Sequence, residues 1–221
     1  VSRKGGCMID HLFPIPIGIY ERPVKITNKE LNFLENLKRR KNESNYTSVN
    51  DYILQCAELK DLYKFLKECL EDYVAQTIAP DQKQLQFYVT QSWSNYTKSG
   101  EYHQMHKHQN SIVSGVFYPQ VDEHDNITYR NYDETAGTQM PLHIEPVSFN
   151  RYNSATWKYP VKVGQLYLFP SSLQHCVETR PDNKEATRIS ISFNSWCEGQ
   201  LGDPKQLNSL NLTKEARYDF E

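Results

Sequence analysis

The sequence predicts a single, mainly β domain that has helices near its N-terminus, and two features lead to this prediction. Between residues 27 and 80, apolar residues recur every three or four positions, which is the spacing of an amphipathic helix. From Leu85 onward, apolar and polar residues alternate, and short runs rich in β-branched and aromatic residues follow, as is typical of strands. The 221 residues, 38% of them hydrophobic, are enough for one sizeable core.

The composition argues against several classes of protein. A net charge of −2 gives no general attraction to nucleic acid or to a membrane surface. No apolar run approaches the roughly 20 residues of a membrane span. The five cysteines are odd in number and show no C-x-x-C spacing, which favours a reducing compartment over a disulfide framework. We therefore expect a cytoplasmic protein.

We expect one domain over residues 8–221. Residues 1–7 lack an initiator methionine and precede Met8, so we interpret them as a cloning remnant or a trimmed extension. Within the domain, residues 27–80 form a helical support, residues 83–197 the β core, and residues 198–221 a polar tail with a helical turn after Thr213.

Two helices are predicted in the support. Thr27 is a candidate N-cap with Glu30 as its capping-box partner, and the first helix should run to the basic residues Lys38–Lys41, which would form its solvated C-terminus. The second helix should span Glu58–Ala79, with an apolar stripe that faces the core.

Strands are predicted at Leu85–Ser92, Ile112–Tyr118, Ile127–Tyr129, Leu142–Ser148, Gln165–Phe169 and Arg188–Asn194. The polar insertion from Asp122 to Trp157 either borders a site or is a surface meander.

Three histidines are candidate metal ligands. His106 and His108 are two residues apart, so on an extended strand their imidazoles point to one face and can reach one ion. His175 lies 67 positions after His108 (175 − 108 = 67), just beyond another predicted strand. A pair of this kind also occurs by chance on surfaces, and the third histidine favours the metal site.

Arg188 is a candidate anion-binding residue. It shares one strand face with Ser190, while Ile189 and Ile191 share the other. A buried guanidinium without a partner costs several kcal/mol, so a buried Arg188 should meet an anion, and its planar fork suits a carboxylate. The alternative is a surface arginine on an edge strand.

In order and spacing, these pieces resemble the Fe(II)/2-oxoglutarate-dependent oxygenases, most closely a group found in bacteria and phages. That group shows W…G…H-x-H…S-G-V-x-Y, then G-x-L-x-L-F-P-S-x-L-x-H-x-V, then R-x-S-x-x-F-N, and each piece is present here between about Leu12 and Trp196. The resemblance implies a double-stranded β-helix, a jelly-roll or cupin-like fold with helices packed on one sheet. It also implies Fe(II) and 2-oxoglutarate as cofactors, with O2, and hydroxylation of a substrate coupled to decarboxylation of 2-oxoglutarate to succinate.

The resemblance also implies roles for single residues. His106 and His175 match the two metal-binding histidines, and His108 stands where most of the superfamily has Asp or Glu. Arg188 matches the arginine that binds the far carboxylate of 2-oxoglutarate, with Ser190 and Tyr118 beside it. Alternatively, His108 lines the pocket and a carboxylate such as Asp122 replaces it as a ligand.

Two other functions compete with this one. The first is a three-His dioxygenase of cupin type that does not use 2-oxoglutarate. The second is a jelly roll that binds a metal or a sugar without catalysis. Neither needs a buried arginine beside the metal, so Arg188 discriminates between them and the oxygenase.

Overall fold

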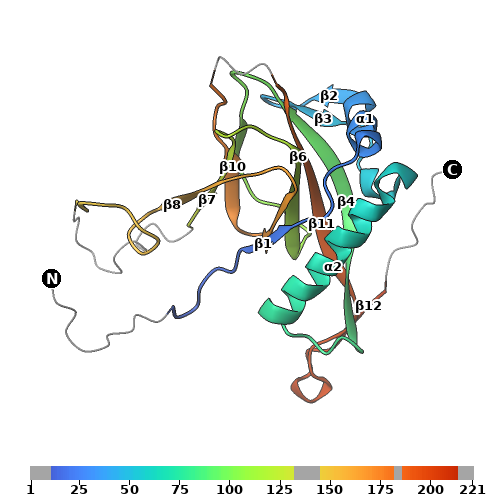
Figure 1. The fold of residues 1–221 in the computed structure, drawn as a ribbon. Coiled ribbons are helices and arrows are strands. Elements are labelled where there is room, and N and C mark those ends of the chain that lie inside the picture. The colour runs from blue at the N-terminus through green and yellow to red at the C-terminus, as the bar shows by residue number, and fades with distance from the viewer. Residues whose placement is uncertain (1–10, 132–144, 182–185, 214–221) are drawn as a thin grey trace.

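The structure, a computed structural model, describes residues 11–131, 145–181 and 186–213. Two antiparallel sheets make up most of it (Figure 1). The larger sheet contains, in spatial order, β1 (Gly18–Glu21), β9 (Gln165–Pro170), β6 (Val113–Gln120), β11 (Arg188–Leu201), β4 (Leu85–Thr97), β3 (Tyr46–Ser48) and β2 (Arg39–Lys41), and β12 (Leu210–Leu212) pairs with β11. The smaller sheet contains β5 (His103–His106), β10 (Gln174–Val177), β7 (Asn126–Arg130) and β8 (Thr156–Pro160).

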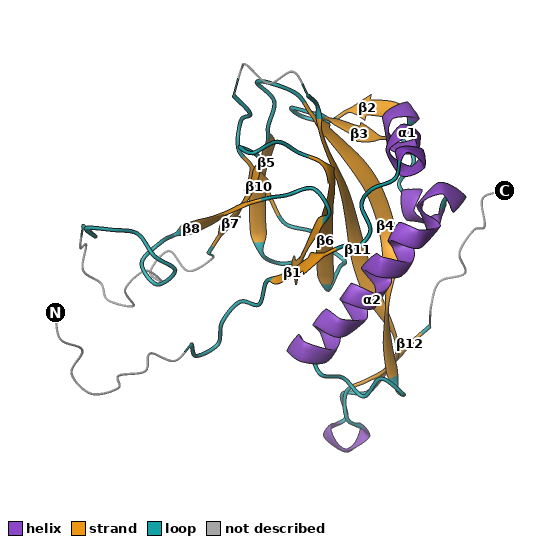
Figure 2. Ribbon diagram, in the orientation of Figure 1, coloured by secondary structure: helices purple, strands orange, loops and turns teal. Residues whose placement is uncertain are grey.

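The helices lie on one side of the larger sheet, as predicted, with the smaller sheet on the other side (Figure 2). They are α1 (Asn28–Asn36) and α2 (Lys60–Thr77), joined in part by the 3-10 turns Ile53–Gln55 and Ala57–Leu59, and a third 3-10 turn covers Pro204–Gln206. No helix in the described ranges is both long and apolar enough to cross a membrane.

The helix α2 packs on the outer face of β11. Leu62, Leu66 and Leu70 are fully buried and share one core with Ile189, Ile191 and Phe193. Burying such a side chain contributes about 1.5–3 kcal/mol, so this seam fixes the phase of β11. The predicted assignment of the two faces of this strand is therefore confirmed, and Arg188 turns inward.

A capping box begins α1, as the sequence predicts. The Thr27 hydroxyl accepts from the Glu30 amide at 3.2 Å, and the Glu30 carboxylate accepts from the Thr27 amide at 2.8 Å. The carboxylate also accepts two hydrogen bonds from the buried Arg22 guanidinium. Arg22 thereby joins the end of β1 to the start of the helix.

The predicted end of this helix is wrong. The helix stops at Asn36, because Leu37 adopts an extended backbone with φ −61° and ψ 138°. The basic residues that follow form the exposed edge strand β2 instead of a helix C-terminus. The Arg39 guanidinium lies 3.8 Å from the centre of the Tyr96 ring, a cation–π contact that favours this path.

Other details also differ from the prediction. Strands β3, β8, β10 and β12 were not predicted, and Glu145–Ser148 form no strand; residues 142–144 of that predicted strand lie outside the described ranges. Strand β11 continues to Leu201 and pairs with β12, in a stretch expected to be a polar tail. The helical turn predicted after Thr213 and the segment 1–7 also lie outside the described residues.

Gly115 leads to a prediction about core packing. A Cβ at this position would lie 2.3 Å from Cζ of Phe193 and 2.9 Å from a methyl carbon of Leu168, both across neighbouring strands. Gly115→Ala should therefore destabilise the fold by about 1–3 kcal/mol, as overpacking of a core does. Urea unfolding measures this loss. The double variant with Phe193→Leu should lose less than the sum of the two single changes, and strict additivity would refute the clash.

Candidate functional site

The three candidate histidines converge between the sheets. His106 ends β5 and is the direct partner of His175 on the neighbouring strand β10. Their ring centroids lie 4.3 Å apart, and the His108 ring lies 5.0 and 5.1 Å from those of His106 and His175. One nitrogen from each ring lies within 4.8 Å of the other two. One metal ion can therefore contact all three.

His108 reaches this position from a loop and not from a strand face. Strand β5 stops at His106, and the amide of His108 donates to the Ser171 carbonyl at 3.0 Å. The convergence was predicted, and the structure adds that the strand itself ends at His106, so that His108 lies just beyond it.

Two backbone carbonyls set the tautomers of the strand histidines. Nδ1 of His106 lies 2.8 Å from the Gln104 carbonyl, and Nδ1 of His175 lies 3.0 Å from the Leu173 carbonyl. A carbonyl oxygen only accepts, so each Nδ1 carries the proton and donates. Nε2 of each ring then presents a lone pair, which is the arrangement of metal-binding histidines in proteins.

The three imidazoles are neutral at physiological pH. Burial lowers the pKa of His106, lowers that of His108 to about 4, and lowers that of His175 well below its ordinary value. For His108 and His175, the neighbouring His106 contributes to this lowering of the pKa. A neutral imidazole is the form that binds a metal, so this donor set fits a divalent first-row ion such as Fe(II).

Asp122 does not join this group. In the described ranges, the only set of three or more His, Cys, Asp or Glu side chains placed to share an ion is His106, His108 and His175. The Asp122 carboxylate instead accepts from Arg180 at 3.1 Å. The structure therefore disfavours Asp122 as a substitute for His108.

His103 lies against the cluster without belonging to it. Its ring stacks on that of His106, with centroids 4.4 Å apart and an interplanar angle of 10°. Burial, together with the nearness of His106, His108 and Arg188, lowers the pKa of His103 to about 3. Arg188 is thus close enough to act electrostatically on the histidine end of the interior.

Arg188 is buried, with 2% of its surface exposed, and part of its guanidinium has no partner. Neither Nε nor Nη1 makes a hydrogen bond. The guanidinium carbon lies 5.2 Å from the centre of the ring of Tyr118, a fully buried residue whose hydroxyl also has no partner. Orphaned buried donors cost about 1–3 kcal/mol each, and more when charged, so a native interior that contains them is built to receive an acceptor.

Ser190 lies one pleat from Arg188 on the same face and is 5% exposed. Its direct partner on β4 is Asn95, which donates to the Ser192 hydroxyl at 2.9 Å while its Oδ1 has no partner. The structure thus brings together Arg188, Ser190 and Tyr118, as the sequence predicted, and adds Asn95.

A second buried arginine, Arg180, was missed. Its guanidinium donates to the carboxylates of Asp125 and Asp122 and to the carbonyls of Thr97 and Ala186. Thr97 is the strand partner of Arg188, so these bonds hold the backbone beside it. This role could not be predicted from the sequence, because Arg180 opens a charged segment typical of an exposed turn.

The Arg180–Asp125 pair supports a stability prediction. Their side chains are 3% and 2% exposed, so Asp125→Ala leaves a buried charge short of partners and should cost about 3–5 kcal/mol. The matched control is Asp51→Ala, which breaks the Arg40–Asp51 pair, with side chains 54% and 29% exposed, and should cost about 0–1 kcal/mol. Chemical denaturation measures both. Equal losses would contradict the structural role of Arg180.

Comparisons with known proteins agree with this geometry. Residues 91–194 match a family model described as "Putative 2OG-Fe(II) oxygenase". This segment includes the three histidines and Arg188. No curated protein matches the chain in sequence.

Three solved structures illustrate the similarity in fold. A 2OG-Fe(II) oxygenase family oxidoreductase from Burkholderia pseudomallei is 9% identical, with 74% of each chain covered and a TM-score of 0.51. HygX from Streptomyces hygroscopicus, with nickel and 2-oxoglutarate bound, is 10% identical, with 82% of each chain covered and a TM-score of 0.51. A prolyl-4-hydroxylase from Pseudomonas putida is 14% identical, over 81% of this chain and 92% of that one, with a TM-score of 0.50. At these identities the likeness establishes the fold, and the predicted double-stranded β-helix is confirmed.

Proposed function

We propose, from the match of residues 91–194 to the 2OG-Fe(II) oxygenase family, that the protein is such an oxygenase, in which His106, His108 and His175 hold Fe(II) while Arg188 binds the far carboxylate of 2-oxoglutarate. Tyr118 and Ser190 complete the carboxylate site. The reaction is a 2-oxoglutarate-dependent oxygenation, most simply hydroxylation of a substrate. The sequence match covers about half of the chain, and the interior described above supplies the residues.

One observation supports this assignment above the others. Arg188 is buried with two donor nitrogens unpartnered, and a dicarboxylate that reaches from the histidines into the interior would satisfy them. A three-His dioxygenase that does not use 2-oxoglutarate has no use for such a residue, and neither has a metal- or sugar-binding jelly roll.

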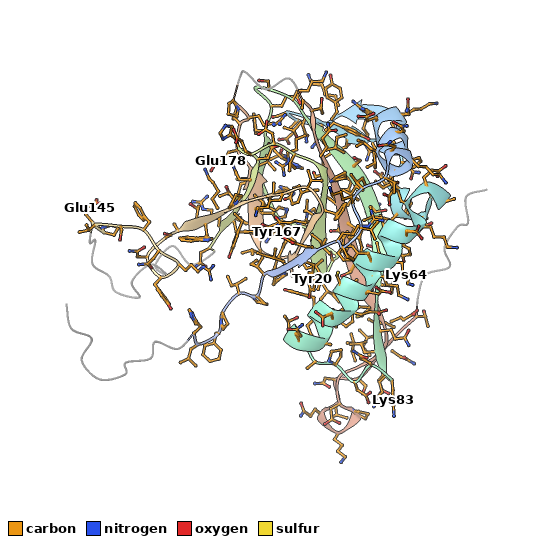
Figure 3. The ribbon with its side chains drawn as sticks, in the orientation of Figure 1. Tyr20, Lys64, Lys83, Glu145, Tyr167 and Glu178 are labelled. Carbon is orange, nitrogen blue, oxygen red and sulfur yellow. The ribbon has the colours of Figure 1, made fainter. Side chains whose placement is uncertain are left out.

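With Fe(II) bound, 2-oxoglutarate and O2 would supply the oxidising chemistry, which yields succinate, CO2 and the hydroxylated substrate. The residues of the chain bind and orient the reactants. His106 and His175 keep their protons on Nδ1, held by carbonyls, so that Nε2 stays free. Arg188 forms charge-assisted hydrogen bonds to the co-substrate, and Tyr118 donates beside it. Tyr167 belongs to the cluster of apolar and aromatic side chains that packs between the sheets (Figure 3).

The test is an anaerobic titration of the metal-free protein with Fe(II) and then with 2-oxoglutarate. The proposal predicts one Fe(II) per chain and a visible charge-transfer band that appears only when both are present. Absence of the band, at a concentration of 2-oxoglutarate that saturates a control oxygenase, would overturn the co-substrate assignment.

His108 replaces the carboxylate that most of the superfamily uses, so the triad carries one negative charge fewer. His108→Asp should still bind Fe(II), because it restores two histidines and a carboxylate. His108→Ala should bind Fe(II) at least about tenfold more weakly. Even the loss of a residue that only hydrogen-bonds to a metal ligand lowers metal affinity by about 10–100-fold. Anaerobic titration measures both variants. If His108→Ala keeps the parent's affinity, His108 only lines the pocket.

We further propose that the protein works in a reducing compartment, the cytoplasm. The four cysteines in the described ranges, Cys56, Cys69, Cys176 and Cys197, are all free thiols. Fractionation of expressing cells would test this.

A further inference from the structure

Tyr129 lies in line with the candidate metal ligands. Across the smaller sheet, His106 on β5 pairs with His175 on β10, and His175 pairs in turn with Tyr129 on β7. Directly paired residues of antiparallel strands project to the same face, so the three side chains form one row. The rings of Tyr129 and His175 have centroids 6.3 Å apart. Tyr129 therefore borders the interior that would receive the co-substrate.

The Tyr129 hydroxyl has no hydrogen-bond partner, although the residue is only 5% exposed. Its ring packs edge-on against Phe169 at 5.1 Å and against Tyr159 at 6.0 Å. These aromatic neighbours hold the phenol in place without satisfying it. A buried tyrosine hydroxyl normally finds a partner.

Other buried tyrosines of the described chain show this norm. The hydroxyls of Tyr73, Tyr96 and Tyr167 each donate to a backbone carbonyl, those of Pro16, Leu34 and Pro160 respectively. Tyr118 and Tyr129 are the exceptions. These two share one core cluster between the sheets. Two orphaned phenols and an incompletely paired guanidinium thus line the same interior.

We propose that Tyr129 is a further co-substrate-binding residue, whose hydroxyl donates a hydrogen bond to the far carboxylate of 2-oxoglutarate beside Tyr118 and Arg188. A carboxylate offers about four acceptor positions. Nε and Nη1 of Arg188 and the two phenols are four donors without a partner. This inference rests on the proposed function, because it assigns one more residue to the same site.

The test uses nickel-loaded protein and isothermal titration with 2-oxoglutarate, so no turnover is required. Tyr129→Phe removes only the hydroxyl and should weaken 2-oxoglutarate binding by about tenfold, the loss expected for one hydrogen bond to a charged group. Nickel affinity should stay within about twofold of the parent, since the histidines are untouched. The melting temperature of the metal-free protein should not fall, because the removed hydroxyl had no partner.

The matched control is Tyr167→Phe, the same change in the same cluster. The Tyr167 hydroxyl already donates to the Pro160 carbonyl at 3.1 Å, so this variant should lose stability and keep its affinity for 2-oxoglutarate. A second probe is 2-oxobutyrate, a 2-oxo acid without the far carboxylate. Tyr129→Phe should bind it as the parent does, whereas an equal weakening for both ligands would overturn the assignment to the far carboxylate.

Arg188→Ala, titrated in parallel, separates the two proposals. If it weakens 2-oxoglutarate binding while Tyr129→Phe does not, the inference about Tyr129 is overturned and the proposed function stands. If neither variant changes the affinity, the co-substrate site itself is wrong and the inference fails with it.

Discussion

His175→Ala should abolish tight metal binding. His175 is 5% exposed, and one of its ring nitrogens lies within 4.8 Å of a ring nitrogen of both His106 and His108, so this substitution removes one of the three candidate ligands. Loss of even an outer-shell partner of a metal site costs about 10–100-fold in affinity, so loss of this ligand should cost at least about a hundredfold. In a thermal shift assay, metal at a hundred times its dissociation constant stabilises the parent by about 2.7 kcal/mol, and the variant should show almost none of this gain.

A surface histidine provides the control. The His124 side chain is 55% exposed and lies outside the cluster, so His124→Ala should keep the metal affinity of the parent. If His175→Ala binds metal as tightly as His124→Ala, the ion is held elsewhere and the three-His site is wrong.

Local patterns were enough to predict the two helices and the longer strands of the sheets. The capping box at Thr27 and the apolar face of α2 depend on contacts within a few residues, and both were confirmed. The alternation in β11 predicted its two faces because one side meets a helix and the other a polar interior. Strand β8 escaped prediction for two reasons. Its residues are all exposed or half-buried, so no buried apolar run marks it, and its partner β7 lies on the other side of a long insertion. The end of α1 failed because basic residues suit a helix C-terminus and an exposed edge strand equally well.

The candidate site was predicted where a residue type is unusual at its position. An arginine on a strand that alternates with isoleucines indicates an anion, and the three histidines indicate a metal. Tyr129 and Arg180 carried no such sign. The chain has fifteen tyrosines, so a single tyrosine on a predicted strand does not indicate a site. Only the pairing of β7 with β10 places Tyr129 beside His175. Arg180 depends on carboxylates 55 and 58 positions away, which no local pattern reveals.

Replacing Arg188 should weaken 2-oxoglutarate binding without lowering the stability of the metal-free fold. Arg188→Ala removes a charge-assisted fork and should weaken 2-oxoglutarate binding by roughly 1.5–3 kcal/mol, about tenfold or more, by isothermal titration of the nickel-loaded protein. Arg188→Lys should recover little of this, because an ammonium cannot reproduce the planar fork. Wild-type affinity in the lysine variant would show that charge alone suffices and that the unpartnered nitrogens are incidental.

In the metal-free protein, the loss of the Arg188 guanidinium should not lower the melting temperature, although it weakens 2-oxoglutarate binding. Replacing even a buried ion pair by apolar side chains of similar volume is often neutral or stabilising by about 1–4 kcal/mol. Arg188 has two donor nitrogens without a partner, so Arg188→Met should melt no lower than the parent. Arg180→Met is the matched control, because that guanidinium is equally buried but donates to two carboxylates and two carbonyls. It should melt well below the parent. If Arg188→Met is destabilised as much as Arg180→Met, Arg188 is a structural residue, and its open donors do not identify a ligand site.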